Sequence, residues 1–294
     1  MKFYGPIVRP QTDANSVFIE VTVGCTHNEC TFCNFYKEYP FRVIPLDQVE
    51  ENLKEASILY PHAKRIWASG GNPFALSTEK LKELAILFQK YFPKANIATY
   101  ARVDDLYNKS VEDIRVLKNL GINDIVIGIE SGDDEVLKKV KKGYTSSDII
   151  RECQKLEEAG MIYRVIYLGG LGGYGKGIEN ALNSAKVFNQ IHPTYMIMTN
   201  VSVLPDTELY QEMQIGSFKE ASEKERIQEF RTLIANLDNT ITVDSRTAAN
   251  SIYFVANLPE DKQTLVAKLD KIIENFTETE ETIFHSRRAK MTSV

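Results

Sequence analysis

The chain has 294 residues, of which 43% are hydrophobic and 26% are charged, and its formal net charge is −5. This length suits one large α/β domain or two small ones, with ample material for a core. No apolar stretch approaches the ~18–20 residues of a membrane span. The acidic balance argues against a broad nucleic-acid footprint. The N-terminus shows no apolar signal-peptide segment. We expect a cytoplasmic protein in a reducing setting, where clustered thiols survive, with no membrane partner and with nucleic acid not favoured as a partner.

Strand-like and helix-like patterns alternate through residues 17–204. Apolar runs rich in Ile, Val, Thr and Tyr, typical of buried parallel strands, lie at 17–23, 65–71, 96–103, 124–131, 163–170 and 195–204. Helix patterns, several with Ser, Thr or Asp caps and two followed by glycine, lie at 46–60, 77–92, 110–121, 146–160 and 177–191. This alternation predicts an α/β fold over residues 1–204, in which about six βα units form a parallel sheet curved into a partial TIM-type barrel.

The repeat loosens after Pro205. The pattern there predicts a helix at 221–238, strands at 241–245 and 252–257, and an amphipathic helix at 258–276. No Gly/Ser/Pro-rich linker precedes this part. We therefore expect residues 205–294 to be a C-terminal α/β extension packed on the barrel, with the last ten residues mobile.

Three cysteines lie together on the loop that follows the first strand. Cys25, Cys30 and Cys33 have the spacing C-x4-C-x2-C, and the remaining cysteine, Cys153, lies in a helix pattern. Three thiolates suffice to hold three irons of a 4Fe-4S cluster, which leaves the fourth iron open to a small molecule. The carboxyl end of a strand is also where α/β folds place their chemistry. The sequence therefore predicts an iron–sulfur site.

Other interpretations of the cysteines remain open. A disulfide framework does not suit four cysteines in a chain of this length without a secretory signal. A zinc site would need a fourth ligand, for which His27 lies inside the first gap in an unfavourable geometry. Unrelated packing thiols are the remaining alternative.

The cysteine loop, in the run CTHNECTFCNFYKEYPFR, resembles the radical S-adenosylmethionine (SAM) superfamily, and the resemblance covers about residues 15–205. Most members have C-x3-C-x2-C, so this chain has one extra residue in the first gap. The cysteine segment resembles that of an uncharacterised subgroup of the superfamily. This subgroup is distantly similar to anaerobic coproporphyrinogen oxidases and to tRNA-modifying radical SAM enzymes. The resemblance implies that the open iron binds SAM and that an electron cleaves it to methionine and a 5′-deoxyadenosyl radical, which abstracts hydrogen from a substrate. An electron donor such as flavodoxin or ferredoxin is implied as well.

A second motif ends the strand at 65–71. Ser69, Gly70, Gly71 and Asn72 resemble the superfamily's glycine pair, whose backbone binds the methionine amino group of SAM, although Asn72 stands where an acidic residue is usual. The alternative is an ordinary turn between a strand and a helix, which glycine also favours.

Further candidate contacts to SAM follow from the same resemblance. Glu130, with Ser131 in the run GIESG, would bind the ribose hydroxyls, and Gly169 would begin a backbone wall beside adenine. Lys142, twelve positions after Glu130, would hold the SAM carboxylate as a point charge, and Phe32 would shield the cluster and present its backbone to adenine. Taken alone, Glu130 fits a solvated side chain and Gly169 fits a flexible loop.

Two arginines interrupt apolar runs. Arg102 and Arg164 lie on predicted strands, where an unpartnered charge is rarely buried. We expect both to point into the pocket as catalytic or substrate-contacting residues, with Tyr195 as a further candidate.

These features predict a radical SAM enzyme that acts on a small organic molecule. One alternative is a tRNA- or peptide-modifying radical SAM enzyme. The other is a non-enzymatic iron–sulfur or zinc-binding protein, such as an electron carrier or sensor.

Overall fold

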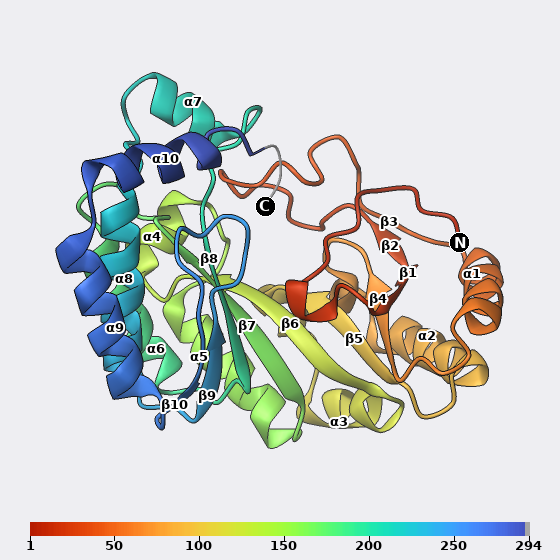
Figure 1. The fold of residues 1–294 in the computed structure, drawn as a ribbon. Coiled ribbons are helices and arrows are strands. Elements are labelled where there is room, and N and C mark those ends of the chain that lie inside the picture. The colour runs from red at the N-terminus through yellow and green to blue at the C-terminus, as the bar shows by residue number, and fades with distance from the viewer. Residues whose placement is uncertain (292–294) are drawn as a thin grey trace. The chain divides into compact units, whose positions relative to one another are not determined.

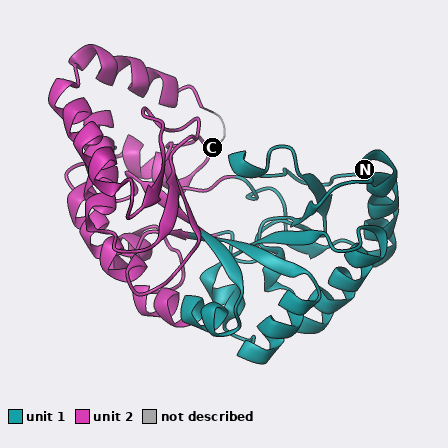
Figure 2. Ribbon diagram, turned by 60° about the horizontal axis from the view of Figure 1, so that its bottom comes forward, with its two compact units in different colours: residues 1–28, 35–128, 152–164 teal, residues 29–34, 129–151, 165–294 magenta. Residues whose placement is uncertain are grey.

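The structure, a computed structural model, describes residues 1–291 and divides the chain into two compact units (Figure 2). The first unit comprises residues 1–28, 35–128 and 152–164, and the second comprises 29–34, 129–151 and 165–294. Each unit is described by itself.

The first unit contains parallel strands with helices between them (Figure 1). Its strands are β1 (Val17–Glu20), β2 (Thr22–Val23), β3 (Arg42–Val43), β4 (Arg65–Ser69) and β5 (Asn96–Ala101). Its helices are α1 (Leu46–Leu59), α2 (Thr78–Tyr91) and α3 (Val111–Asn119), with 3-10 turns η1 (Gln11–Asp13), η2 (Pro73–Ala75) and η3 (Val103–Leu106). β1 pairs in parallel with β4, and β4 with β5.

Three elements have residues in both units: β6 (Ile122–Glu130), α5 (Ser146–Glu158) and β7 (Ile162–Gly169). The second unit otherwise contains α4 (Asp134–Lys139), α6 (Gly177–Phe188), β8 (Tyr195–Asn200), α7 (Glu208–Gln214), α8 (Glu223–Asn236), β9 (Ile241–Asp244), β10 (Val255–Leu258), α9 (Lys262–Asn275) and α10 (Glu278–Arg288).

The main sheet has the strand order β1-β4-β5-β6-β7-β8-β9-β10, so its edges are β1 and β10 and it is open rather than closed. The six predicted strands are consecutive neighbours in this order, and the predicted α/β class is confirmed. Most residues of β1, β4 and β7 are buried, as expected where helices cover a parallel sheet.

Capping residues and glycines define the ends of several helices, close to the positions that the sequence predicts. Ser77 caps α2, and Ser110 forms a reciprocal capping box with Asp113 at the start of α3. Gly121 and Gly160, which follow α3 and α5, have φ angles of 99° and 68°, a region that favours glycine after a helix.

The C-terminal extension continues the sheet. β9 pairs in parallel with β8, and β10 pairs antiparallel with β9. The helix predicted to start at 258 begins at Lys262 instead, because Leu258 is still paired in β10 and Asp261 Oδ2 accepts a hydrogen bond from Asn257 N at 2.8 Å in the connecting turn.

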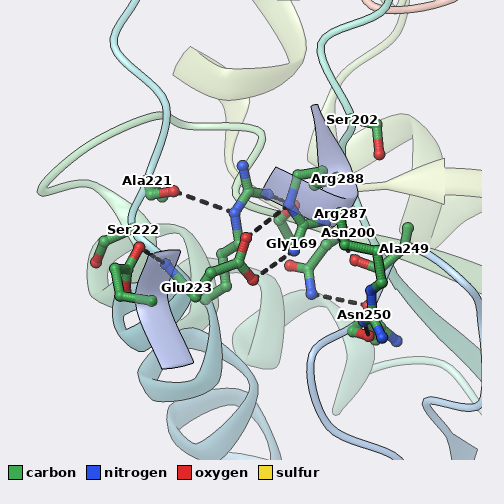
Figure 3. A network of polar contacts seen from close by, with 12 residues as sticks. Gly169, Asn200, Ser202, Ala221, Ser222, Glu223, Ala249, Asn250, Arg287 and Arg288 are labelled. Carbon is green, nitrogen blue, oxygen red and sulfur yellow. Dashed lines mark hydrogen bonds and ion pairs between the residues drawn. The ribbon is translucent and has the colours of Figure 1, made fainter. Parts of the chain in front are cut away.

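The prediction that the last ten residues are mobile is wrong for residues 285–288, and its last three residues lie outside the described part of the chain. Residues 285–288 complete α10, whose Arg288 is buried and donates two hydrogen bonds to Glu223 of α8 (Figure 3). Arg287 and Arg288 also donate to the backbone oxygens of Asn250 and Ala249. The helix has too weak an apolar pattern to be predicted, and these polar contacts fix it.

Within residues 1–291, no helix combines the length and the apolar character needed to cross a membrane.

Candidate functional site

In the first unit, Cys25 lies directly after β2 and Gly24, where the end of β4 comes close. Gly71 N donates to Gly24 O at 3.1 Å, and a Cβ on Gly71 would lie only 2.3 Å from that oxygen. A Cβ on Gly70 would lie 2.0 Å from Thr22 Oγ1. The glycine pair is therefore required for the strand end to pack against the start of the cysteine loop.

Asn72 ties that loop to the end of β5. Its Oδ1 accepts from Thr26 N at 3.0 Å, and its Nδ2 donates to Thr26 Oγ1 at 2.7 Å. The same Nδ2 lies 2.9 and 3.1 Å from the two carboxylate oxygens of Asp105. An acidic residue at position 72 would face the Asp105 carboxylate, so the amide is the residue type that fits here.

Asp105 is buried and carries a shifted pKa. Burial is the main cause and raises the pKa to about 7, whereas the hydrogen bond from Arg102 N at 2.8 Å opposes the shift. Lys109 Nζ donates to the backbone oxygen of Asp105 at 2.9 Å, and burial lowers the pKa of this lysine to about 8. Neither residue is predicted from the sequence, where the only signal is the acidic pair that follows Arg102 in the run RVDDL.

Arg102 lies at the carboxyl end of β5, where it was predicted. Its guanidinium forms a two-point contact with Asp104, with both N–O distances at 2.9 Å. The Nη2–Oδ2 contact is a hydrogen bond, whereas Nε and Oδ1 form an ion pair without hydrogen-bond geometry.

Arg164 lies at the other end of the strands, two residues after the start of β7. It donates to Asp124 Oδ1 at 3.1 Å, Asp13 Oδ2 at 2.7 Å and Thr12 Oγ1 at 3.0 Å. Burial disfavours the Asp13 charge, but Arg164 and Arg65 outweigh it and hold the Asp13 pKa below its ordinary value. Because parallel barrels keep their chemistry at the carboxyl ends, this placement weighs against the predicted substrate role of Arg164.

Tyr195 has a similar position, as the first residue of β8, where its hydroxyl bonds to Asp244. Trp67 is fully buried and stacks on Phe18 with ring centroids 5.3 Å apart.

Buried polar atoms without protein partners lie at the carboxyl end of β4. Among residues 1–291, Ser69 Oγ and Thr22 Oγ1 are buried and have no hydrogen-bond partner. Such atoms are rare in native proteins unless a ligand or water satisfies them. They fit a polar ligand at this strand end, as SAM would require.

In the second unit, the other two cysteines lie on a backbone turn. Cys33 N donates to Cys30 O at 3.3 Å, and Thr31 between them donates to Val140 O at 3.2 Å and accepts from Leu209 N at 2.8 Å. Phe32 packs against an apolar cluster of Val136, Val140, Leu168, Leu171, Val201, Leu209 and Phe218. This cluster anchors the turn that carries Cys30 and Cys33.

Glu130 and Lys142 come together in this unit, as do two aromatic rings. Lys142 Nζ lies 3.4 Å from Glu130 Oε1, 5.9 Å from the Phe32 ring centroid and 5.4 Å from that of Tyr144. Glu130 has a φ of 69°, a left-handed conformation that is strained for a non-glycine residue and is common at functional sites.

Ser131 and Gly169 have partners of their own. The Ser131 hydroxyl donates to Asn180 Oδ1 at 2.5 Å, and Gly169 O accepts from Val201 N at 2.9 Å. Ser131 thus supports its turn through α6. Asn180 is not predicted from the sequence, because a polar residue on an amphipathic helix resembles a solvated one.

The donor set fits an iron–sulfur cluster by its chemistry. All four cysteines are thiols rather than disulfides, and three of them lie within nine residues. Within residues 1–291, no three His, Cys, Asp or Glu side chains are gathered as ligands for a metal ion. Thiols are the ligand type that such a cluster requires.

Relatives of known name match much of the chain. HemW of Bacillus subtilis (strain 168), a heme chaperone, is 24% identical over 223 residues, which cover 73% of this chain and 58% of its own. Threonylcarbamoyladenosine tRNA methylthiotransferase MtaB of Rickettsia prowazekii is 27% identical over 153 residues, 47% of this chain and 34% of its own. The solved structure of Escherichia coli coproporphyrinogen III oxidase (HemN) has a TM-score of 0.58 at 18% identity, covering 75% of this chain and 51% of that one.

The chain spans little more than half the length of the heme chaperone and about half that of the oxidase. The Radical SAM superfamily model matches residues 19–185, which include the cysteine loop, the glycine pair and the Glu130 turn. That match covers more than half of the 294 residues, and the chain belongs to the radical SAM superfamily.

Proposed function

We propose that the chain is a radical SAM enzyme that holds a 4Fe-4S cluster through Cys25, Cys30 and Cys33 and acts on a small organic substrate. The observation that carries the proposal is the set of three thiols within nine residues, in a chain whose superfamily uses this cluster and SAM. A cluster bound there would supply the electron for reductive cleavage of SAM, which yields methionine and a 5′-deoxyadenosyl radical able to abstract hydrogen from a substrate.

The role we assign to the protein is to bind and orient SAM and to shield the reaction from water. We assign the SAM carboxylate to Lys142, whose ammonium is held within a buried aromatic surrounding. We assign the ribose hydroxyls to Glu130, because its strained backbone directs a carboxylate from the end of β6. The backbone at Ser69, Gly70 and Gly71 is assigned to the amino group, with the unpartnered Ser69 hydroxyl as a further contact.

Arg102 is the candidate for contact with the substrate. It lies at the carboxyl end of β5, and its pairing with Asp104 leaves the planar group oriented rather than mobile. The electron donor we propose is a flavodoxin or ferredoxin.

The test is the formation of 5′-deoxyadenosine. Protein reconstituted anaerobically with iron and sulfide, then reduced with dithionite in the presence of SAM, should release 5′-deoxyadenosine and methionine in equal amounts on chromatography. Cys30→Ala should abolish the product, whereas Cys153→Ala should retain it, because Cys153 is fully buried in α5, away from the cysteine loop in sequence. Product at the level of Cys30→Ala in the native sequence would refute the proposal.

The similarity to the heme chaperone favours a second candidate, a heme-handling protein that does not cleave SAM. It predicts a saturable Soret band on titration with hemin and no 5′-deoxyadenosine. The similarity to a tRNA methylthiotransferase favours a third, modification of tRNA, for which copurifying RNA is the measurement. The net charge of −5 favours the small substrate over tRNA.

A further inference from the structure

α8 of the C-terminal extension carries Glu229, a carboxylate fully buried beside the end of β7. Its Oε2 accepts from Gly170 N at 2.8 Å. Its Oε1 accepts from the Tyr167 hydroxyl at 2.7 Å and from Asn180 Nδ2 at 2.7 Å. One side chain of the extension therefore joins β7, the glycine that follows it, and α6.

Asn180 carries the connection to the turn after β6. Its Oδ1 accepts from the Ser131 hydroxyl at 2.5 Å, and that oxygen accepts from Asp133 N at 2.9 Å. Gly132 N donates to Ser184 Oγ, one helical turn further along α6, at 2.8 Å. The turn that carries Glu130 is thus held by the same polar cluster that holds the end of β7.

Two further residues of α8, Arg226 and Phe230, lie close to Gly170 and Gly169. Arg226 Nη1 donates to Val201 O at 3.0 Å and would lie 2.2 Å from a Cβ on Gly170. A Cβ on Gly169 would lie 2.6 Å from the Phe230 ring. Positions three and four apart share one side of a helix, so this side of α8 is shaped to the backbone at 169–170.

Burying a carboxylate at this position costs free energy, because the charged form is removed from water. Burial raises the pKa of Glu229, and the bonds from Tyr167, Gly170 and Asn180 act against that rise. An apolar side chain of similar volume would often give equal or better stability at such a site. What the carboxylate adds is direction, because its oxygens accept from three donors at fixed positions.

We propose that Glu229 is a positioning residue that fixes the strand ends carrying Glu130 and Gly169, so that the C-terminal extension sets the affinity for SAM. This rests on the proposed function, since it takes those strand ends as SAM contacts. Glu229 itself acts through Gly170 and Asn180, with no contact to the cofactor assigned to it.

The test uses the full-length, reconstituted protein and a matched pair of variants. Glu229→Gln keeps the size of the side chain but offers an amino group to at least one donor, so one buried N–H loses its partner. Glu223→Gln is the control, because Glu223 is buried on the same helix but pairs with Arg288 and contacts neither strand end (Figure 3). Both variants should lower the melting temperature.

Calorimetric titration with SAM should show a Kd raised about tenfold, or about 1.4 kcal/mol, for Glu229→Gln and changed less than about twofold for Glu223→Gln. Hydrogen–deuterium exchange should be faster at residues 130–133 and 168–171 in Glu229→Gln alone, with or without iron. Asn180→Leu removes the hydrogen bonds of Asn180 to Ser131, Tyr167 and Glu229 and leaves the bond from Gly170 N to Glu229 in place. If Glu229→Gln does not fold, this variant should show the same faster exchange at residues 130–133.

Equal SAM affinity in the two glutamate variants would overturn the positioning role. If the native sequence fails to bind SAM, the proposed function fails. The exchange rates at the two turns then still decide whether Glu229 positions them, and equal rates in both variants would overturn the inference.

Discussion

Burial moves the protonation of Asp105 into the neutral range. Its pKa of about 7 in the folded state exceeds the ordinary value of 3.8, so between these values the folded state binds more protons than the unfolded state. Stability therefore falls as pH rises through this window. Asp105→Asn keeps an oxygen acceptor for Asn72 and Arg102 without the charge.

We accordingly expect the native sequence to lose free energy of unfolding relative to Asp105→Asn between about pH 4 and pH 7. Urea denaturation at pH 5 and pH 8 measures the difference. A native-minus-variant difference that does not change between the two pH values would contradict the raised pKa.

Arg164 offers a prediction on stability rather than on chemistry. Arg164→Met leaves two buried carboxylates, Asp13 and Asp124, with Arg65 as their remaining cation. Breaking a buried ion pair costs about 3–5 kcal/mol. We therefore expect the free energy of unfolding, measured by denaturation, to fall by about 3 kcal/mol. Arg246→Met, which breaks a pair whose arginine is largely exposed, should cost under about 1 kcal/mol.

The yield of 5′-deoxyadenosine per folded chain should be unchanged in Arg164→Met. A stable variant that has lost turnover would restore the catalytic role that the sequence predicted.

Among single residues, the sequence patterns predicted candidate site residues at the strand ends. They did not predict the buried polar residues that form hydrogen bonds or ion pairs with them. Glu130 and Lys142, separated by twelve positions, do meet in the structure. Arg164 was expected in the pocket because a lone arginine in an apolar run shows no partner in the sequence. Its partners Asp13 and Asp124 are brought near it by strand pairing, which one-dimensional spacing does not contain. Glu229 was not predicted for the same reason, since its hydrogen-bond partners are distant in the sequence.

The elements differ in how they are stabilised, and this predicts the effect of truncation. Ending the chain after Asp238 removes β9 and β10, which exposes the edge of β8, and also removes α9, which lies beside α8 (Figure 1). We expect this form not to fold, because unpaired backbone and apolar surface would be left exposed. Ending it after Phe276 removes α10 alone and should give a folded chain with a lower melting temperature.

Circular dichroism and urea unfolding distinguish the two truncations. A cooperative unfolding transition in the shorter form would show that the extension is an independent layer, with the site supported by residues 1–238 alone.

The elements predicted well from the sequence were the buried parallel strands, whose apolar runs and glycine ends are strong local signals. The short helices α4 and α7 were missed, since each has only one or two turns. α10 was not predicted because it is held by contacts of Arg287 and Arg288 with distant backbone. The predicted start of α9 was too early because Leu258 is the last residue of a strand.

For the molecule as a whole, the central claim is that three thiolates of one loop hold a cluster with an iron left open for SAM. The iron–sulfur chemistry must be measured on this chain itself.

The most direct measurement is the electron paramagnetic resonance spectrum of the reconstituted, dithionite-reduced protein, recorded with and without SAM alongside iron analysis. We predict about four irons per chain, a reduced-cluster signal that shifts when SAM is added, and loss of both in Cys25→Ala, Cys30→Ala and Cys33→Ala but not in Cys153→Ala. A signal that SAM leaves unchanged, or iron retained at full occupancy in the three loop variants, would contradict the account.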